Sequence, residues 1–471
     1  MIRLALAEAA EVMHGRASGF GPDAGGRLLA GVVTDSRLTT PGTLFVAITG
    51  DRVDGHDFVG EALARGAAAA LVSRPVDGPS ILVDDTVAAM GLLAAAARQR
   101  LDGCSVIALT GSSGKTSTKD LLAQVLEGFG STIAPEGSFN TEVGVPMTIF
   151  RADERTAYLV LEMGMRGLGH IAYLCEIARP EIGVILNVGS AHLGVVGSRD
   201  AIAEAKGEIL DLLPAHGCAV LAGDDPAVMS QGHRTGAHVV AFGESDRVDV
   251  RAAEVRLDEQ ARASFTINAS GESAAVHLQF HGRHYVANSL AVAAVCLSLG
   301  LPLAQVAAGL SAATPRSRWR MEVQRAADGT TVINDAYNAN PESMRAAMQT
   351  LTAMATEHRT WAVLGEMLEL GDASEKEHAD LGRLASSLGI NLVCVGPGTR
   401  AIHRASCESA GHSTWVATAD AATELLAAQV GPGDIVLVKA SRGVGLEAVA
   451  ITLIEILDAD QPTVAPVGGT G

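Results

Sequence analysis

The sequence predicts an α/β protein built from three domains with mainly parallel sheets. Its 471 residues exceed what one core usually holds, and at roughly 150 residues per domain they suggest three domains. Predicted strands alternate with predicted helices along nearly the whole chain. This alternation is typical of helices layered on parallel strands. A glycine-rich turn between a strand and a helix marks the central domain.

The first predicted domain spans residues 1–100 and is a small α/β unit. Its strands are expected at GVVTD, TLFVAI, AALV and SILV. One helix is expected from Phe58 to Arg65, and another, from Val87 to Arg100, leads into the next domain.

The central predicted domain spans residues 101–313 and opens with the apolar strand SVIALT. A glycine-rich turn and a helix from Thr116 to Leu126 follow at once. Further strands are expected at AYLVLEMG, IGVILNVG and AVLAGDD. The alternating pattern from Ala252 to His281 predicts additional strands at the edge of this domain.

A long uncharged stretch runs from Tyr285 to Pro315. A membrane span is one interpretation of such a stretch. Polar residues and the sequence Gly-Leu-Pro at 300–302 favour a buried helix from about Val286 to Leu299, a break, and a second helix.

The third predicted domain spans residues 314–458, and the tail at 459–471 is expected to be disordered. Strands are expected at TTVINDAY, TWAVLGEM, NLVCVGP, STWVAT and DIVLVKAS, with helices between them. This is the pattern of a doubly wound, Rossmann-like sheet, although the GxGxxG fingerprint of dinucleotide binding is absent.

Charge and cysteine usage exclude several classes of protein. The formal net charge of −18 makes nucleic-acid binding a poor hypothesis. Six cysteines without a CxxC pair argue against a zinc ribbon and a disulfide framework, and they indicate a reducing compartment. Glu8 and Glu11 interrupt the first apolar stretch, which is therefore not predicted to be a signal peptide.

The strongest chemical signal is the segment TGSSGKTS, which begins at Thr110. Glycines between a buried strand and a helix allow successive N–H groups and the helix N-terminus to face a phosphate. The usual pattern has one more glycine, where this chain has Leu109. Lys115 would reach the β- and γ-phosphates and Thr116 would bind Mg²⁺. The predicted phosphate-binding residues are Gly111, Ser112, Ser113, Gly114, Lys115, Thr116 and Ser117.

Three single residues are weaker candidates. Glu162 ends a predicted strand beside this turn, where it is either a Mg²⁺ ligand or a strand-end acid bonded to loop N–H groups. His192 follows another strand and, taken alone, is more often a turn or core residue than a ligand. Lys206 lies on a predicted helix, and by itself it is expected to be solvated.

Polar clusters follow several strands of the third domain. Asp335–Pro341 ends a strand and starts a helix, with Asn340 as its N-cap. Leu364–Gly371 and Lys439–Arg442 occupy the same kind of position, and Lys439 with Arg442 could bind a carboxylate or a phosphate. The alternatives are a well-capped strand–helix junction and a salt-bridged helix start. In the first domain, Asp35–Arg37 could contact a nucleotide-sugar diphosphate or could be ordinary turn residues.

Together these segments resemble the Mur ligase family over nearly the whole chain. The DSR and DGHDF segments resemble its UDP-binding domain, and TGSSGKTS, NVGSAHL and AKGEI resemble its ATP-binding, P-loop domain. DAYNANPESM and VLGEMLELG, followed by His378, together with GSFNTEVGVPMT, resemble the MurF type within the family. Folylpolyglutamate synthases resemble only the central and C-terminal parts.

The resemblance implies a cytoplasmic, monomeric ligase that uses ATP to join D-alanyl-D-alanine to UDP-N-acetylmuramoyl-tripeptide through an acyl phosphate, the last cytoplasmic step of peptidoglycan precursor synthesis. No nucleic acid and no membrane insertion are implied. The alternatives are a Mur-type ligase with a different acceptor and a non-catalytic nucleotide-binding regulator. Diaminopimelate and lysine both remain possible as the third residue of the substrate peptide.

The resemblance also implies roles for single residues. Lys115, Glu162, His192 and Lys206 would be catalytic, with Thr116 and Glu162 on one Mg²⁺ and with His192 and a carbamylated Lys206 on a second. Asn288, Arg320 and Asp335 would contact ATP. Substrate contacts are implied for Asp35, Ser36, Arg37, Asn140, Tyr337, Asn338, Lys439, Ser441 and Arg442.

The chain departs from the MurF-type pattern at three positions. Tyr285 and Ala222 stand where asparagines are usual, and this leaves the adenine contacts open. Ala440 replaces a usual glycine.

Overall fold

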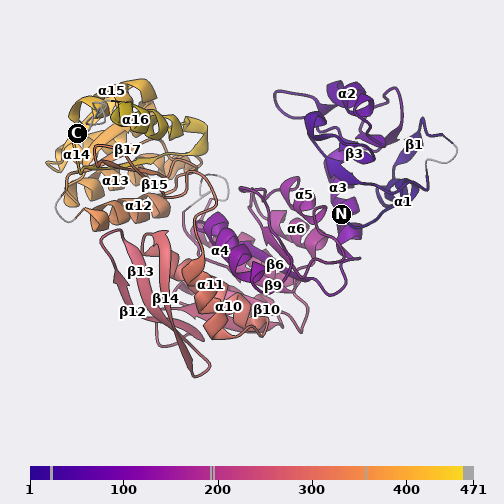
Figure 1. The fold of residues 1–471 in the computed structure, drawn as a ribbon, viewed down its shortest axis with the longest axis horizontal. Coiled ribbons are helices and arrows are strands. Elements are labelled where there is room, and N and C mark those ends of the chain that lie inside the picture. Colours follow the sequence, from indigo (N-terminus) through magenta and orange to yellow (C-terminus); the bar gives the residue numbers. More distant parts are fainter. Residues whose placement is uncertain (22–24, 191–193, 195–196, 356–357, 460–471) are drawn as a thin grey trace, which may run out of the picture. The chain divides into compact units, whose positions relative to one another are not determined.

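The computed structural model describes residues 1–21, 25–190, 194, 197–355 and 358–459, and the expected disordered tail lies outside them except for Ala459. The chain forms two compact units (Figure 1). The first unit comprises Met1–Asn187, Ala203–Asp249 and Ala291–Pro302. The second comprises Val188–Ile202, Val250–Leu290 and the chain from Leu303 onward. The described residues form three sheets, which confirms the predicted α/β class.

The first unit begins with a sheet in the order β1-β5-β4-β3-β2. Strands β2 to β5 are parallel, and β1 is antiparallel to β5. All four predicted strands and both predicted helices are present, while α1 and β1 are additional. The elements are α1 (Leu6–Val12), β1 (Arg16–Ser18), β2 (Gly31–Val33), β3 (Thr43–Val46), α2 (Val59–Ala64), β4 (Ala69–Val72), β5 (Ser80–Leu82) and α3 (Thr86–Arg98).

The rest of the first unit is built on parallel strands in the order β11-β10-β9-β6-β8-β7, which belong to the second of the three sheets. The carboxyl ends of β6, β8 and β9 are neighbours, so the loops that follow them share one edge of the sheet. The elements are β6 (Ser105–Thr110), α4 (Lys115–Glu127), β7 (Thr132–Ile133), α5 (Gly144–Ile149), β8 (Tyr158–Glu162), α6 (His170–Ala178), β9 (Ile182–Ile185), α8 (Arg199–Asp211), β10 (Cys218–Ala222), α9 (Pro226–Met229) and β11 (His238–Gly243).

The expected strands between Ala252 and His281 form an antiparallel meander of β12 (Val250–Leu257), β13 (Arg262–Ala269) and β14 (Glu272–His281). Helices α10 (His284–Ser298) and α11 (Leu303–Ala312) follow, separated at Gly300 as predicted. Gly300 has φ 76°, a left-handed conformation that commonly ends a helix.

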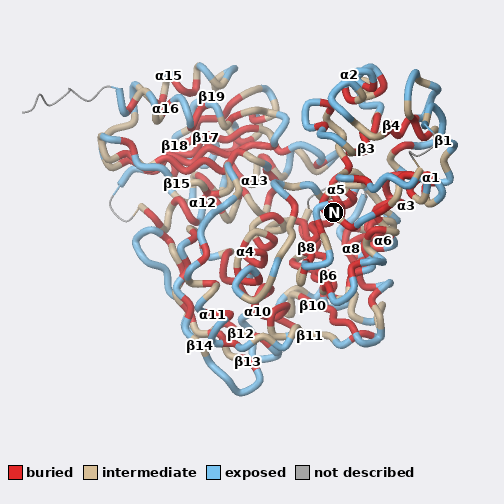
Figure 2. The backbone as a smooth tube through the Cα atoms, turned by 45° about the vertical axis from the view of Figure 1, so that its right-hand side comes forward, coloured by how far each residue is buried: buried red, intermediate tan, exposed pale blue. Residues whose placement is uncertain are grey.

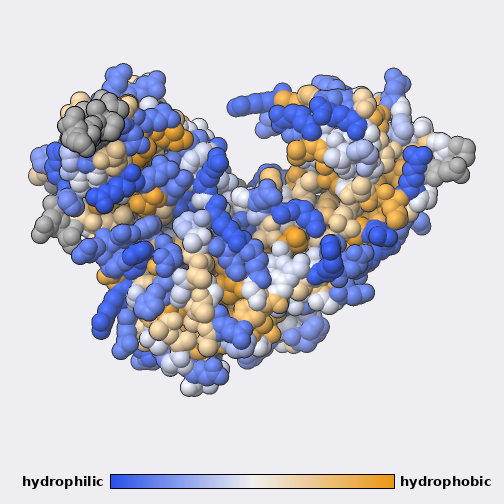
Figure 3. Space-filling view, in the orientation of Figure 1, coloured by the Kyte–Doolittle hydropathy of each residue, from blue (hydrophilic) through white to orange (hydrophobic). Residues whose placement is uncertain are grey.

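The membrane interpretation of this uncharged stretch receives no support. Among the described residues, none of the helices combines the length and the apolar character needed to cross a bilayer. On the face drawn in Figure 3, hydrophobic residues are interspersed with hydrophilic ones.

The second unit ends in the predicted doubly wound sheet, in the order β15-β16-β20-β17-β18-β19. Its strands are parallel except for β15, an edge strand antiparallel to β16. The elements are β15 (Glu322–Arg325), β16 (Thr331–Asn334), α12 (Pro341–Met354), β17 (Thr360–Leu364), α13 (Ser374–Ser387), β18 (Asn391–Val395), α14 (Arg400–Glu408), β19 (Ser413–Val416), α15 (Ala419–Gln429), β20 (Ile435–Lys439) and α16 (Glu447–Ala459).

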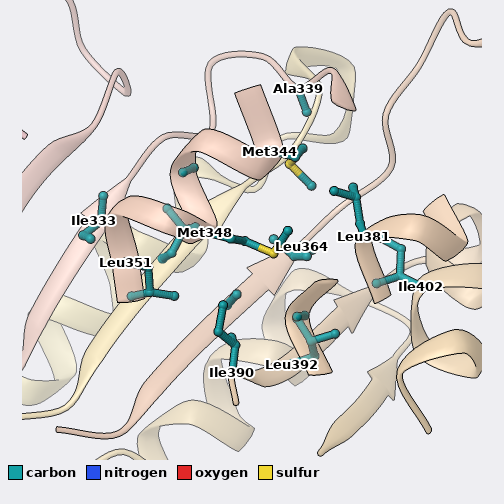
Figure 4. Packing of buried hydrophobic residues seen from close by; sticks show 14 of the residues in the cluster. Ile333, Ala339, Met344, Met348, Leu351, Leu364, Leu381, Ile390, Leu392 and Ile402 are labelled. Carbon is teal, nitrogen blue, oxygen red and sulfur yellow. The ribbon is translucent and has the colours of Figure 1, made fainter. Parts of the chain in front are cut away.

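Alternate side chains of these strands enter two cores, one on each face of the sheet. Ala362 and Leu364 belong to the cluster under α12, α13 and α14, whereas Trp361 and Val363 belong to the cluster under α15 and α16. Figure 4 shows Met348 and Leu364 within the first cluster, and Figure 2 shows the strands as a buried band. Strands buried on both faces carry apolar runs such as TWAVL without polar alternation.

Candidate functional site

The predicted phosphate loop lies between a buried strand and a helix N-terminus, as expected. Thr110 ends β6, and Gly114, with φ 78°, is the N-cap of α4. At Gly111 a Cβ atom would lie 2.9 Å from the Cβ of Leu186, so a larger residue would strain this turn. The first N–H groups of α4 therefore face the position where a phosphate would bind.

An asparagine that the sequence analysis did not identify holds the loop. Asn187 accepts a hydrogen bond at Oδ1 from the Ser113 N–H (2.9 Å) and donates from Nδ2 to the Ser113 carbonyl (3.1 Å). The Lys115 ammonium donates to the Gly111 carbonyl at 2.6 Å. The available signal for Asn187 was its position two residues after the buried strand β9, at the same sheet edge as the loop.

Glu162 lies beside this loop as a buried carboxylate with a free oxygen. Its Oε1 accepts from Asn140 Nδ2 at 2.7 Å, while its buried Oε2 has no hydrogen-bond partner. A buried carboxylate oxygen without a partner is costly unless a cation satisfies it. The Thr116 hydroxyl, also buried, is 2.9 Å from Ser138 Oγ. Oxygen donors of this kind fit a divalent cation that also binds nucleotide phosphates.

Lys206 corrects one expectation, because it is not solvated. Only 1% of the residue is exposed, and its Nζ lies 3.9 Å from Met165 Sδ. Burial and the charge of Lys115 lower the pKa of Lys206 well below its usual value. This side chain is therefore biased toward the neutral, nucleophilic amine.

The predicted second-metal residue His192 lies outside the described residues. Within the described part of the chain, no group of three or more His, Cys, Asp or Glu side chains could hold a metal ion.

The strand-end clusters of the last sheet meet at the edge where β16, β20 and β17 end. Lys439 Nζ is 2.6 Å from Asp335 Oδ2 and donates to the Asn338 carbonyl at 2.8 Å. Ser441 Oγ accepts from the Leu368 N–H at 3.0 Å. Asn340 is the N-cap of α12, as predicted, and it also forms a reciprocal capping box with Ser343.

The positive pair predicted from Lys439 and Arg442 is already engaged within the chain. Lys439 is buried against Asp335; burial lowers its pKa, and the nearby Asp335 charge opposes that shift. Arg442 pairs with Glu447 at the start of α16 (2.7 Å) and lies over the Trp319 ring at 4.3 Å. The alternative of a salt-bridged helix start therefore describes Arg442, and Lys439 orders the Asp335 loop.

Strained backbone positions flank Arg320. Trp319 and Met321 have φ values of 58° and 50°, which are unfavourable for residues with side chains. Glu322 accepts from the Trp319 N–H (3.0 Å), and Asp335 accepts from the Met321 N–H (3.0 Å). The Arg320 guanidinium lies over the Tyr337 ring at 4.1 Å from its centroid. Two predicted site residues, Arg320 and Tyr337, are thus in contact.

The buried Asp335–Lys439 pair is expected to matter for stability. Asp335→Asn or Lys439→Met leaves one charge without its partner, so each change should cost about 3–5 kcal/mol in the unfolding transition of this sheet. All three tryptophans lie between residues 319 and 415, so their fluorescence in urea reports on this part of the chain. Lys376→Met, at an exposed pair with Asp380, is the matched control and should cost under about 1 kcal/mol. Equal effects of the buried and exposed changes would contradict this prediction.

Helix α10 carries two residues that the sequence analysis singled out, Asn288 and Tyr285. Asn288 is buried, and its Nδ2 has no hydrogen-bond partner. Tyr285, which replaces the usual asparagine, is buried and stacks on Phe280 with ring centroids 4.7 Å apart.

The first-domain candidates form local turns on the first sheet. Asp35 caps a short turn and binds the Arg37 guanidinium, which holds the pKa of Asp35 at about 2. Ser36 donates to Glu61 at 3.0 Å. In the following DGHDF segment, Asp54 accepts from His56 Nδ1 at 2.6 Å. Local turn chemistry explains these contacts, and Arg37 remains largely exposed toward solvent.

Comparisons with known proteins agree with this geometry. Residues 29–100 match the catalytic domain of the Mur ligase family, residues 109–296 its middle domain, and residues 319–442 its glutamate ligase domain. The UDP-N-acetylmuramoyl-tripeptide–D-alanyl-D-alanine ligase of Mycobacterium tuberculosis is 46% identical over 96% of this chain and 98% of its own. The enzyme of that name from Escherichia coli is 37% identical over 97% and 99%.

Solved structures give the same picture. MurF from Acinetobacter baumannii superposes with a TM-score of 0.88 at 33% identity, covering 96% of this chain and 99% of its own. MurF from Thermotoga maritima, solved in complex with ADP, gives a TM-score of 0.81 at 30% identity, covering 91% and 98%.

Proposed function

Because the chain belongs to the Mur ligase family, we infer that it is an ATP-dependent ligase that joins D-alanyl-D-alanine to UDP-N-acetylmuramoyl-tripeptide. Its 46% identity over nearly the full length of such a ligase carries this conclusion. The reaction forms an amide bond and contributes to peptidoglycan precursor synthesis.

We propose that the reaction passes through an acyl phosphate, since a free carboxylate does not form an amide spontaneously in water. An oxygen of the terminal carboxylate of the tripeptide attacks the γ-phosphorus of ATP. The bond between that phosphorus and the oxygen bridging to the β-phosphate breaks, so ADP leaves. The dipeptide amine then attacks the acyl carbon and loses a proton. The carbon–oxygen bond to phosphate breaks, and inorganic phosphate leaves as the amide forms.

The phosphate loop would bind and orient ATP. The N–H groups of Gly111 to Ser117 and the Lys115 ammonium would neutralise negative charge on the β- and γ-phosphates. Asn187 holds the Ser113 peptide in place, so the loop is preorganised. Asn288, Arg320 and Asp335 would add nucleotide contacts, and the unpartnered Nδ2 of Asn288 supports this role.

The residues at the edge of this loop fit Mg²⁺. Thr116 and Glu162 would hold one ion, and the unpartnered Oε2 of Glu162 supports this assignment. His192 and Lys206, the latter carbamylated by CO₂, would help to hold a second. Bound Mg²⁺ would supply charge stabilisation for the phosphoryl group. Lys206 is buried, its Nζ lies 3.9 Å from Met165 Sδ, and burial lowers its pKa; these observations support carbamylation.

The remaining predicted residues would bind the two other substrates. Asn140 would lie near the muramoyl group, and Asp35, Ser36 and Arg37 near the UDP group. Tyr337, Asn338, Ser441 and Arg442 would face the incoming dipeptide, while Lys439 would keep their loop ordered.

We also propose that the enzyme is monomeric and that it works in the cytoplasm, where ATP and UDP-linked precursors occur. Its six free cysteines suit a reducing compartment.

Phosphate release from ATP tests this function directly. It is measured with UDP-N-acetylmuramoyl-tripeptide, with and without D-alanyl-D-alanine, for the lysine and diaminopimelate forms of the tripeptide. Release that requires both substrates, with a pentapeptide product, is the expected result. Phosphate release that requires the tripeptide substrate but does not depend on the dipeptide would indicate another acceptor. No release with any acceptor would favour a nucleotide-binding regulator.

A further inference from the structure

Helix α4 carries a second lysine, Lys119, and the side chain of this one is buried. Lys119 lies one helical turn beyond Lys115, and its side chain is 1% exposed. Its Nζ donates to the carbonyls of Pro135 (2.7 Å) and Gly137 (3.0 Å) and pairs with Asp120 Oδ1 (2.7 Å). An ammonium group has three N–H donors, and these three oxygens satisfy them. Lys119 is therefore committed to the chain itself and does not offer its charge to a phosphate.

The segment that Lys119 holds contacts both proposed Mg²⁺ ligands. Ser138 Oγ lies 2.9 Å from the Thr116 hydroxyl. Asn140 Nδ2 donates to Glu162 Oε1 at 2.7 Å, leaving Oε2 without a partner. Each contact therefore fixes the rotamer of one proposed ligand through a residue on this segment.

The segment from 134 to 140 has no regular secondary structure between β7 and α5, so side-chain contacts must order it. Arg151 donates to the Ala134 carbonyl at 2.9 Å from an exposed position. The Gly164 N–H donates to the Asn140 carbonyl at 2.8 Å. Between these two ends, Lys119 supplies two buried bonds to the backbone next to Ser138. Hydrogen bonds to charged groups in buried sites are the stronger class.

We propose that Lys119 is a positioning residue for the magnesium site: by holding Pro135 and Gly137, it places Ser138 and Asn140 so that Thr116 and Glu162 present their oxygens to the metal. This rests on the proposed function only in assigning Thr116 and Glu162 to Mg²⁺. The anchoring itself is a property of the chain without ligands.

Calorimetric titration of ADP into the full-length protein, once with Mg²⁺ and once with EDTA, separates metal positioning from nucleotide binding. In Lys119→Met, we expect the gain in ADP affinity from Mg²⁺ to fall by at least ~10-fold, the range found for residues that orient metal ligands. Affinity in EDTA should stay within about twofold, because the phosphate loop does not depend on Lys119. Arg151→Gln, which removes the bond to the Ala134 carbonyl and an exposed ion pair with Glu136 but leaves both Lys119 bonds in place, is the matched control and should keep the gain.

Hydrogen exchange of the ligand-free protein tests the anchoring independently. Lys119→Met should speed exchange across residues 134–140 at least ~10-fold relative to the wild type. Asp120→Asn, which retains both carbonyl bonds to Lys119, should change it much less. Unchanged exchange, or an unchanged Mg²⁺ gain in Lys119→Met, would overturn the proposal. If the wild type binds ADP with Mg²⁺ but ligates no substrate, the proposed function fails while this inference stands.

Discussion

Replacing Lys115 by alanine is expected to reduce ATP-dependent ligation by at least ~10³-fold, equivalent to about 4 kcal/mol of transition-state stabilisation. The side chain starts at the first residue of α4, directly after the left-handed Gly114, so its ammonium points back along the phosphate loop to the Gly111 carbonyl. Charge on the transferring phosphoryl group would draw that ammonium away from the carbonyl. Alanine lacks the positive charge of the ammonium group, although its helix propensity is high, so α4 should still form.

Phosphate release with both substrates present measures this effect, and ADP binding shows whether the nucleotide still enters. The fold should be retained, because the Lys115 side chain is only partly buried and its ammonium bonds a carbonyl of its own loop. Lys376→Ala, at an exposed ion pair, is the matched control and should keep full activity. Wild-type turnover by the Lys115 variant would show that the loop does not act on ATP.

Much of the fold could be predicted because local signals and tertiary structure agree. Apolar runs such as SVIALT are strands buried on both faces, and the Asn340–Pro341 start of α12 carries its own capping information. Elements that were not predicted lack such signals. Helix α5 is short and contains Gly144 and Pro146, and α6 begins after a left-handed Gly169. Strand β15, with the sequence EVQR, is polar and depends on pairing with β16.

The positions of two proposed Mg²⁺ ligands could be predicted from the strand ends that carry them. Thr116 and Glu162 follow neighbouring strands, and the strand order makes them share an edge. The burial of Lys206 was not predictable, because a lysine in AIAEAKGEIL looks solvated until the surrounding sheet covers it. Asn187 and Lys119 were also missed. Their partners lie on distant loops, so only the folded structure reveals what they hold.

For Lys439 and Arg442, the sequence predicted a binding site where the structure shows contacts within the chain. A lysine and an arginine close together in an acidic chain predict an anion site, but the sequence does not show which acids they meet. Asp335 lies far from Lys439 along the chain, yet β16 and β20 are paired neighbours, so the two residues face each other where these strands end. Strand order, which the sequence analysis did not derive, decided this contact.

Replacing Lys206 by methionine is expected to abolish most ligation, by at least ~10²-fold, without destabilising the protein. Methionine keeps much of the apolar stem of lysine, and it avoids burying an amine whose pKa is already lowered by burial. An ordinary buried structural residue would behave differently, because its loss would lower stability and activity together. Thermal unfolding and phosphate release on the same samples therefore separate a functional lysine from a structural one.

Carbamylation adds a second expectation for the wild type. A neutral amine attacks the carbon of CO₂ and loses a proton to solvent, so the side chain becomes an anionic carbamate that could bind a metal ion. A carbamate signal should therefore appear by NMR with isotope-labelled bicarbonate and be absent in Lys206→Met. Lower pH should weaken it, since the protonated amine is not nucleophilic. A wild type without the signal would contradict carbamylation, whereas a fully active Lys206→Met would show that ligation needs no lysine here. An amine enclosed beside Met165, with no carboxylate hydrogen-bonded to it among the described residues, is otherwise a cost to the fold, and that cost is explained if CO₂ completes the group.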